Sequence, residues 1–288
     1  MPQRELVEQA AASLLDPQGR ALAAAVQWWE LPGWPQAWPV AVLGQGQGPP
    51  LLLLHGFDSS HLEYRRLAPL LSGHHQLFIP DLFGFGFCPR PSNAAYNPAG
   101  VLSHLEVLLQ QVLQRSGAPS VGLIGASMGG SVAVELARRQ PGAVNRLLLL
   151  APAGLTGKPM PVPPLLDQLG ARFLALPGVR RGLCRSAFAE PDRDVGPAEL
   201  EIASLHLRCP NWAGALGAFA RSGGFAGCGE PLPGQPIAVL WGANDRILRA
   251  PQKRAAQALL GERITELAAC GHLPHIDQPA TVARTWHG

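Results

Sequence analysis

The chain has 288 residues, of which 47% are hydrophobic and 15% charged, so it can bury a large core and does not belong to the disordered class. A net charge of +3, from 23 basic and 20 acidic side chains without a basic run, argues against a nucleic-acid partner. The five cysteines fit no zinc spacing, which favours reduced thiols and no metal site. No signal-peptide or membrane-spanning stretch is recognisable. We therefore expect a cytoplasmic protein.

Helical periodicity begins the chain, over 3–24 with a break near Pro17, and apolar runs then alternate with amphipathic stretches. Ser60 and Glu63 have the spacing of a capping box at the start of a helix. The first two strands should form a hairpin, and the later runs have the continuous apolar character of strands buried on both faces. The pattern predicts strands at 26–31, 38–44, 49–57, 75–86, 120–125 and 144–152, and helices at 58–71, 98–115 and 128–140.

The pattern changes after Pro152, where residues 156–232 contain short helical pieces and no strand run. Alternation then returns, with strands at 235–242 and 262–269 and helices at 250–260 and 278–287. These elements predict an α/β fold with a mostly parallel central sheet, helices on both faces and a helical cap inserted between strands. The predicted organisation is a core made of 1–155 and 233–288, with a cap over 156–232.

One serine is placed where a buried strand should turn sharply into a helix. In "GLIGASMGGS", Gly125 and Gly129 flank Ser127 in the G-x-S-x-G pattern. Larger side chains at the flanking positions would collide with neighbouring elements, and the turn would strain the backbone at the serine. The pattern therefore predicts a hydroxyl presented at the carboxyl end of the sheet, although a glycine-rich turn alone would also explain it.

A serine hydroxyl needs a base to remove its proton, and the base needs a carboxylate that fixes its tautomer. His272 follows the last predicted strand and is favoured as the base over His275, which we expect to be structural. Asp245 follows the preceding strand and is favoured as the acid, because the run at 144–152 ends without one. Asp277 is interpreted as the cap of the last helix. Phe57, after His55-Gly56, and Met128 would offer their backbone N–H groups as an oxyanion hole.

Five stretches together resemble the α/β-hydrolase family, and the resemblance extends over nearly all of 26–288. They are "HGFDSS", "PDLFGFG", "GASMGG", "WGANDRIL" and "CGHLPHIDQP". The stretch "AFARSGGF" at 218–225 is similar to the cap-to-core return of a cyanobacterial and chloroplast type of member. The resemblance implies a Ser127-His272-Asp245 triad of the serine esterase branch, Phe57 and Met128 as oxyanion donors, and acyl-enzyme chemistry without metal or organic cofactor. Cys88 departs from the serine of many relatives, outside the catalytic set.

The substrate expected from these residues is a small carboxylic ester with a hydrophobic group. A carbon–carbon hydrolase of diketones, an acyltransferase and a slow-turnover ligand receptor on the same fold stay open as alternatives, as does the oligomeric state. We expect most of the apolar cap residues to form the core of the cap and some to line the pocket; they are Leu165, Leu166, Leu169, Phe173, Leu174, Leu176, Phe188, Leu205, Leu207, Trp212, Leu216 and Phe219. The cap cations Lys158, Arg172, Arg180 and Arg181 receive no role.

Four tryptophans lie close together between 28 and 38. An interfacial membrane anchor would explain them, but packing within the predicted hairpin is favoured because the flanks lack a basic face.

Overall fold

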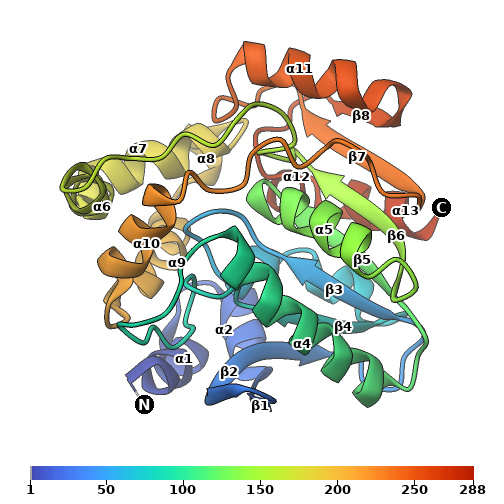
Figure 1. Ribbon diagram of the computed structural model, residues 1–288, viewed down its shortest axis with the longest axis horizontal. Helices are drawn as coiled ribbons and strands as arrows, with labels where there is room; N and C mark the ends of the chain where they lie inside the picture. The colour runs from blue at the N-terminus through green and yellow to red at the C-terminus, as the bar shows by residue number, and fades with distance from the viewer. Residues whose placement is uncertain (1) are drawn as a thin grey trace.

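An eight-stranded sheet forms the centre of the computed structural model, which describes residues 2–288 (Figure 1). The strand order is β1-β2-β4-β3-β5-β6-β7-β8; the first two strands are antiparallel to their neighbours, and the pairs from β4 to β8 are parallel. The strands are β1 (Val26–Leu31), β2 (Trp34–Leu43), β3 (Pro50–Leu54), β4 (Gln76–Pro80), β5 (Val121–Ala126), β6 (Val144–Leu150), β7 (Ile237–Gly242) and β8 (Ile264–Leu267). The predicted α/β architecture is confirmed.

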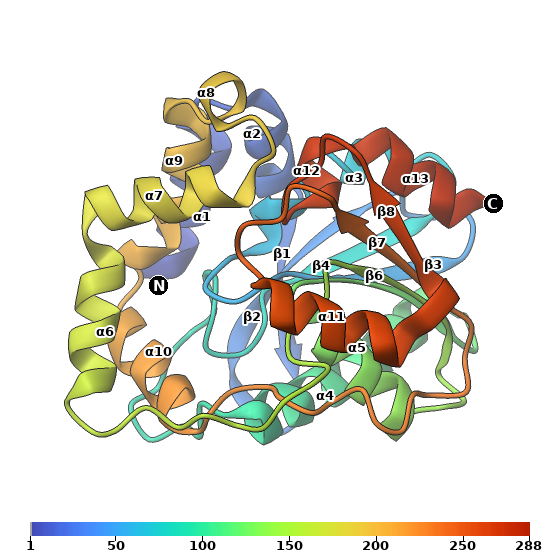
Figure 2. The ribbon, with the colours of Figure 1, turned by 90° about the horizontal axis from the view of Figure 1, so that it is seen from above.

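Helices cover both faces of the sheet, which explains why β3 and β5 are buried along their whole length (Figure 2). One face carries α4 (Pro98–Ser116), α5 (Met128–Arg139) and α11 (Ala250–Leu260). The other carries α1 (Pro2–Ser13), α2 (Pro17–Ala24), α3 (Ala68–Leu71), α12 (Pro274–Asp277) and α13 (Pro279–His287). Each face has its own apolar core, so the sheet is fixed from both sides.

The chain between β6 and β7, residues 151–236, forms a group of helices at one end of the sheet (Figure 2). We call these residues the inserted segment. Its helices are α6 (Leu166–Ala175), α7 (Pro177–Ala187), α8 (Pro191–Asp194), α9 (Pro197–Leu205) and α10 (Trp212–Arg221). Their position past the carboxyl ends of the parallel strands places them above the turn that holds Ser127.

Two local predictions are wrong. Residues 58–71 do not form one helix: a 3-10 turn, His61–Tyr64, precedes the short α3, because Pro69 has no N–H and fits only the first turn of a new helix. Ser60 makes no capping hydrogen bond there. Of the twelve apolar residues expected mostly in the core of the inserted segment, seven belong to apolar clusters or pack against them, as expected. The other five are exposed: Leu165, Leu166, Leu169, Phe173 and Leu176.

The tryptophans near the N-terminus pack against the core, as favoured from the sequence. Trp29 and Trp38 are buried, and Trp34 contacts the rings of Trp38 and Phe83 edge-on. Among residues 2–288, no helix combines the length and the apolar character needed to cross a bilayer.

Candidate active site

Ser127 occupies the sharp turn between β5 and α5 with a strained backbone, at φ 51° and ψ −119°. The flanking glycines are required by close contacts. A Cβ atom on Gly125 would lie 2.4 Å from the carbonyl oxygen of Gly129, and one on Gly129 would lie 2.0 Å from that of Leu54. The turn is therefore compressed between β3 and α5, as the glycine pattern predicts, and Ser127 is held at the carboxyl end of the sheet.

Asp245 and His272, which follow β7 and β8, are brought together by the fold. The Nδ1 atom of His272 lies 2.9 Å from Asp245 Oδ2, which also accepts a hydrogen bond of 3.0 Å from the indole N–H of Trp241. Burial would raise the pKa of the Asp245 carboxyl, but His272 and the amides of Leu248 and Ile247 outweigh it and lower this pKa. An ionised Asp245 favours a proton on Nδ1, which leaves Nε2 as the basic nitrogen.

Ser127 and His272 line the same cavity, which has a volume of about 250 Å³. Phe57 lies on its wall, and residues of the inserted segment close the opposite side, among them Leu174 and Leu183. His272 is also anchored to that segment, since its backbone N–H donates to the carbonyl of Ala187 at 2.8 Å. The cavity thus lies between the strand ends and the inserted helices.

The two predicted oxyanion donors lie beside this cavity. Met128 is the first residue of α5, so its N–H has no partner inside the helix. Phe57 follows β3 in a loop that is fixed by the buried His55 ring: Nδ1 lies 2.7 Å from the Gly56 carbonyl, and Nε2 accepts from the Leu82 N–H at 2.9 Å. Burial lowers the pKa of His55, and the neutral ring fits these two bonds. His55 therefore holds the loop that carries Phe57 in place.

Sequence reasoning missed a buried ionic cluster centred on Asp58, the residue after Phe57. Its carboxylate accepts from Arg180 Nη1 at 2.5 Å and from the indole N–H of Trp212 at 2.8 Å, and it lies 3.1 Å from His206 Nε2. Burial raises the pKa of Asp58, but these partners lower it below its ordinary value of 3.8. The cluster joins the Phe57 loop to three helices of the inserted segment. No local pattern could reveal it, because Arg180 lies 122 positions from Asp58.

A second buried carboxylate supports the same loop from the side of the core. Glu63 accepts from the Gly56 N–H at 3.3 Å, and its Oε1 lies 3.0 Å from His275 Nε2. Burial would raise the pKa of Glu63, but His275 outweighs it, so this pKa is lowered. His275 is fully buried and does not line the cavity, in agreement with the structural role favoured for it.

Asp277 does not cap the last helix, so that interpretation is wrong. Its Oδ2 atom accepts hydrogen bonds from the N–H groups of Gly271, at 2.7 Å, and Ala189, at 3.0 Å. The carboxylate satisfies these two backbone donors, from the residue before His272 and from the residue two positions after α7, while the N-cap position of α13 is Gln278. Asp277 therefore joins the loop that carries His272 to the inserted segment.

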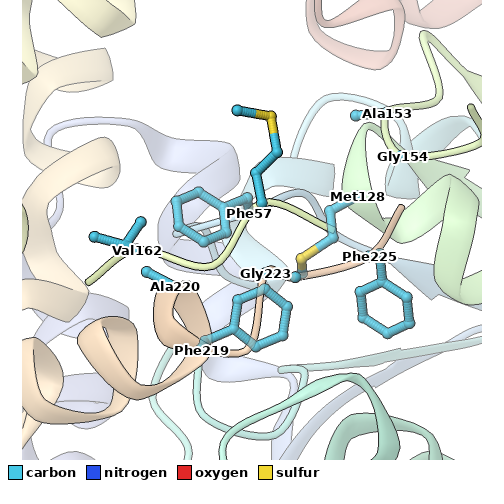
Figure 3. Close-up of a pocket in the computed structure, with 11 residues that line it drawn as sticks. Phe57, Met128, Ala153, Gly154, Val162, Phe219, Ala220, Gly223 and Phe225 are labelled. Carbon is cyan, nitrogen blue, oxygen red and sulfur yellow. The ribbon is translucent and has the colours of Figure 1, made fainter. Parts of the chain in front are cut away.

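A second cavity of about 260 Å³ adjoins the site at Phe57 and Met128 (Figure 3). The inserted segment supplies its remaining apolar walls, including Phe219 and Phe225. The stretch 218–225 that resembles a cap-to-core return thus lines a cavity next to the predicted oxyanion donors.

Cys88 does not line either cavity. Cys88 is fully buried, its thiol donates to the Asp81 carbonyl, and burial raises its pKa well above the ordinary value. Among residues 2–288, no group of three or more His, Cys, Asp or Glu side chains is arranged to hold a metal ion.

Comparison with known proteins agrees with this architecture. The profile of the Alpha/beta hydrolase family matches residues 51–285. The chain belongs to this family. The alpha/beta hydrolase domain-containing protein VTE7 of Arabidopsis thaliana is 29% identical over 82% of this chain and 72% of its own length. The 2-hydroxy-6-oxo-2,4-heptadienoate hydrolase of Pseudomonas putida is 27% identical over 81% of this chain and 86% of its own. The protein is therefore a hydrolase of the alpha/beta hydrolase family.

Solved structures of other family members have the same fold. A 2-hydroxy-6-oxo-6-phenylhexa-2,4-dienoate hydrolase from Rhodococcus has a TM-score of 0.72 at 20% identity, covering 91% of this chain and 98% of its own. A candidate lipase from Acinetobacter baumannii also has a TM-score of 0.72 at 20% identity, covering 99% of this chain and 94% of its own. At this identity the likeness concerns the fold of these hydrolases alone.

Proposed function

We propose that this alpha/beta hydrolase cleaves carboxylic esters that carry a hydrophobic group, with Ser127, His272 and Asp245 as its catalytic triad. The observation that carries the proposal is the 2.9 Å contact between His272 Nδ1 and Asp245, beside a cavity that Ser127 also lines. A carboxylate on Nδ1 leaves Nε2 free to accept a proton from a hydroxyl in that cavity.

In the proposed reaction, Nε2 of His272 takes the Ser127 proton as Oγ attacks the ester carbonyl carbon. The N–H groups of Phe57 and Met128 stabilise the resulting oxyanion, an effect worth about 3 kcal/mol for each donor in other enzymes. The imidazolium then returns the proton to the leaving alcohol, and an acyl group stays on Ser127. A water molecule attacks this acyl-enzyme by the same steps in reverse, which releases the acid and restores the serine.

The nucleophile restricts the reaction to carbonyl substrates. An aspartate nucleophile would form an alkyl ester that water can cleave at its carbonyl, as halide and epoxide hydrolysis require. Ser127 would instead form an ether, which water cannot cleave in that way. Attack on an acyl carbon is the reaction that regenerates Ser127.

The charges around the cavity favour an uncharged ester over a diketone acid. The relative from Pseudomonas putida is named as a hydrolase of 2-hydroxy-6-oxo-2,4-heptadienoate, which carries a carboxylate. Here the cavity lining includes two carboxyl groups of lowered pKa, Asp58 and Glu63, and the guanidinium of Arg180 is paired with Asp58. A substrate carboxylate would therefore meet negative charge without a free guanidinium to balance it.

The second cavity supports a hydrophobic group on the ester. Phe57 and Met128 belong both to its wall and to the proposed oxyanion hole, so an apolar chain attached to the reacting carbonyl can enter it directly. Burial of such a chain contributes about 0.8 kcal/mol for each CH₂ group. In this proposal, the inserted segment acts as a cap that supplies the apolar walls and excludes water from the acyl-enzyme.

The test is the hydrolysis of p-nitrophenyl esters of increasing acyl length by the wild type, Ser127→Ala and the control Ser103→Ala. Ser103 is an exposed serine on α4. We expect kcat/KM to rise with chain length, to fall by about 10⁴-fold or more in Ser127→Ala, and to stay unchanged in Ser103→Ala. Equal turnover by Ser127→Ala would contradict the proposal.

Two further assays separate the other reactions on this fold. A 2-hydroxy-6-oxo dienoate as substrate tests carbon–carbon cleavage, and turnover above that of every ester would replace the proposed substrate class. An added alcohol tests acyl transfer, and formation of a new ester in preference to the free acid would identify an acyltransferase. Tight binding of the esters without turnover would identify a receptor.

A further inference from the structure

The inserted segment exposes apolar side chains in a way that the rest of the protein does not. Ten large apolar residues are exposed among residues 2–288, and seven of them lie between Met160 and Leu183. We call six of these the outer face: Met160, Leu165, Leu166, Leu169, Phe173 and Leu176. Each exposes more than half of its surface, up to 82% for Met160. Apolar exposure concentrated in one segment in this way marks an interaction surface.

The helix α6 is amphipathic, but its large apolar side chains face solvent, whereas those of an ordinary surface helix face the core. Leu166, Leu169 and Phe173, at spacings of three and four residues, share the side that faces solvent. The opposite side carries Asp167 and Ala171, which are buried against α10. Both views of the fold show α6 at the outer edge of the molecule, with α10 between it and the sheet (Figures 1 and 2). The apolar side thus has no partner within the described chain.

This side cannot turn inward without breaking buried ion pairs. Asp167 on α6 is paired with Arg221 of α10, and Arg180 on the adjoining α7 is paired with Asp58 of the core. Each pair has at least one side chain with an exposed fraction of 10% or less, so separation would leave a charge buried without a partner. These two ion pairs therefore keep the outer face exposed to solvent.

Its surroundings are positively charged. Between Lys158 and Ala189 the only acidic residue is Asp167, which is buried and already paired. Lys158, Arg172 and Arg181 are exposed and make no ion pair among the described residues. A second copy of the same face would set these cations against one another. A partner with an anionic surface and an apolar interior would be complementary both to these cations and to the exposed apolar side chains.

The outer face borders one cavity, and the neighbouring Leu183 borders the other. Met160 belongs to the outer face and to the wall of the cavity at Phe57 and Met128. Leu183, also exposed, lines the cavity that holds Ser127 and His272. A molecule that leaves an apolar phase at this face can therefore reach the site along apolar side chains.

We propose that the outer face docks on the surface of an anionic lipid bilayer, with Lys158, Arg172 and Arg181 toward the headgroups, and that the ester substrate enters the site from this surface. The docking stands on the exposed residues and their charge. The identity of the delivered molecule, an ester with a hydrophobic group, rests on the proposed function. A bilayer suits the face because amphipathic surfaces bind it by apolar insertion together with attraction to anionic lipids.

Flotation of the Ser127→Ala protein with vesicles tests docking without any hydrolysis. We expect binding to vesicles of phosphatidylcholine mixed with phosphatidylglycerol, weaker binding to phosphatidylcholine alone, and loss of the difference at high salt.

The double variant Leu169→Ser with Phe173→Ser should weaken binding to the mixed vesicles by about 100-fold. Arg172→Glu with Arg181→Glu should weaken it by about 25-fold or more. The controls, Leu70→Ser on α3 and Arg254→Glu on α11, change an exposed leucine and an exposed arginine elsewhere and should bind like the parent.

Further readouts separate the possible failures. Both double variants should keep the parent's melting temperature. When they are made in the protein that retains Ser127, they should hydrolyse a short soluble ester at the wild-type rate, because none of the four residues lines either of the two cavities. Absence of vesicle binding with normal ester turnover would overturn the docking and leave the proposed function intact. Docking without turnover of any ester would leave the docking intact and contradict the function. A dimer that dissociates in Leu169→Ser with Phe173→Ser would assign the face to a second copy and overturn the proposal.

Discussion

The strand ends around Ser127 and the inserted segment beside them use their side chains in opposite ways. Apolar residues of β3 and β5 are buried without exception. A Cβ atom on either glycine of β5, Gly122 or Gly125, would lie 2.4 Å from a neighbouring atom. In the inserted segment Leu166, Leu169 and Phe173 of α6 face solvent, and Gly170, Gly178 and Gly182 have open space around them. The strand ends therefore hold the proposed reacting groups in fixed positions, whereas α6 of the inserted segment presents apolar side chains to solvent. A change of an apolar residue or a glycine should accordingly have a larger effect on stability in the sheet than in the inserted helices.

Among the variants that compare the two regions, the largest effect on activity should come from Asp245. In Asp245→Asn the imidazole loses the negative charge that stabilises its cationic form, and we expect kcat/KM for esters to fall by about 10³- to 10⁴-fold. The matched control is Asp277→Asn, which changes a carboxylate in the same region that contacts amides and not the imidazole. It should lose less than about tenfold. Similar losses of kcat/KM in the two variants would contradict the proposal that Asp245 takes part in catalysis while Asp277 only supports the loop.

Glycine substitutions compare the two regions by stability. Gly129→Ala would place a methyl group 2.0 Å from the Leu54 carbonyl, so we expect the protein to lose more than about 3 kcal/mol or to fail to fold. Gly182→Ala lies within α7 in open space and should stabilise the protein by about 0.5–1 kcal/mol. Urea unfolding measures both changes. Comparable destabilisation by the two variants would show that the inserted helices are as tightly constrained as the turn at Ser127.

Leucine truncations sharpen the same comparison. Leu53→Ala removes a fully buried side chain from β3 and should lower the free energy of unfolding by about 3 kcal/mol. Leu169→Ala removes a side chain that is 58% exposed and should change it by less than about 0.5 kcal/mol. A large loss in Leu169→Ala would mean that α6 is packed in solution against something that the single chain does not contain.

The smallest loss of stability expected from changing a buried side chain concerns Asp58, which joins the two regions. Its folded pKa lies below the ordinary 3.8, so its stabilising contribution is fully present above that value and is lost as the pH falls through the folded pKa. Asp58→Asn should therefore lower the free energy of unfolding by about 2 kcal/mol near neutral pH. The difference from wild type should stay constant above about pH 5 and shrink as the pH falls below 3.8 through the folded pKa.

The control for this titration is Asp192→Asn, whose carboxylate is 92% exposed in an ion pair with Arg185. It should show no measurable change at any pH, because exposed pairs are screened by solvent. A difference between Asp58→Asn and wild type that stayed constant with pH would mean that the charge of Asp58 does not hold the two regions together.

Much of the sheet half could be predicted from the sequence because its signals are local. Apolar runs mark strands that are buried on both faces, and the glycines beside Ser127 mark a turn that admits no side chain. His272 and Asp245 could be found because each directly follows a strand, and parallel strands end at one edge of a sheet. Their catalytic roles stay proposals.

The inserted segment could not be predicted in the same way. Its apolar residues have helical spacing, and spacing alone does not tell which side of a helix faces the protein. The ionic cluster of Asp58 with Arg180, His206 and Trp212 depends on contacts across more than 120 positions, for which one sequence carries no signal. Asp277 was misinterpreted because a helix cap is the commoner role for an aspartate at such a position.

The most direct measurement of the central claim is the reaction of the protein with a fluorophosphonate, followed by intact mass and peptide mapping. If His272 activates Ser127, the wild type gains one adduct, located on Ser127, at a rate that falls by about 10³-fold or more in His272→Ala. Ser127→Ala should gain none. An adduct on another residue, or an equal rate in His272→Ala, would contradict the account.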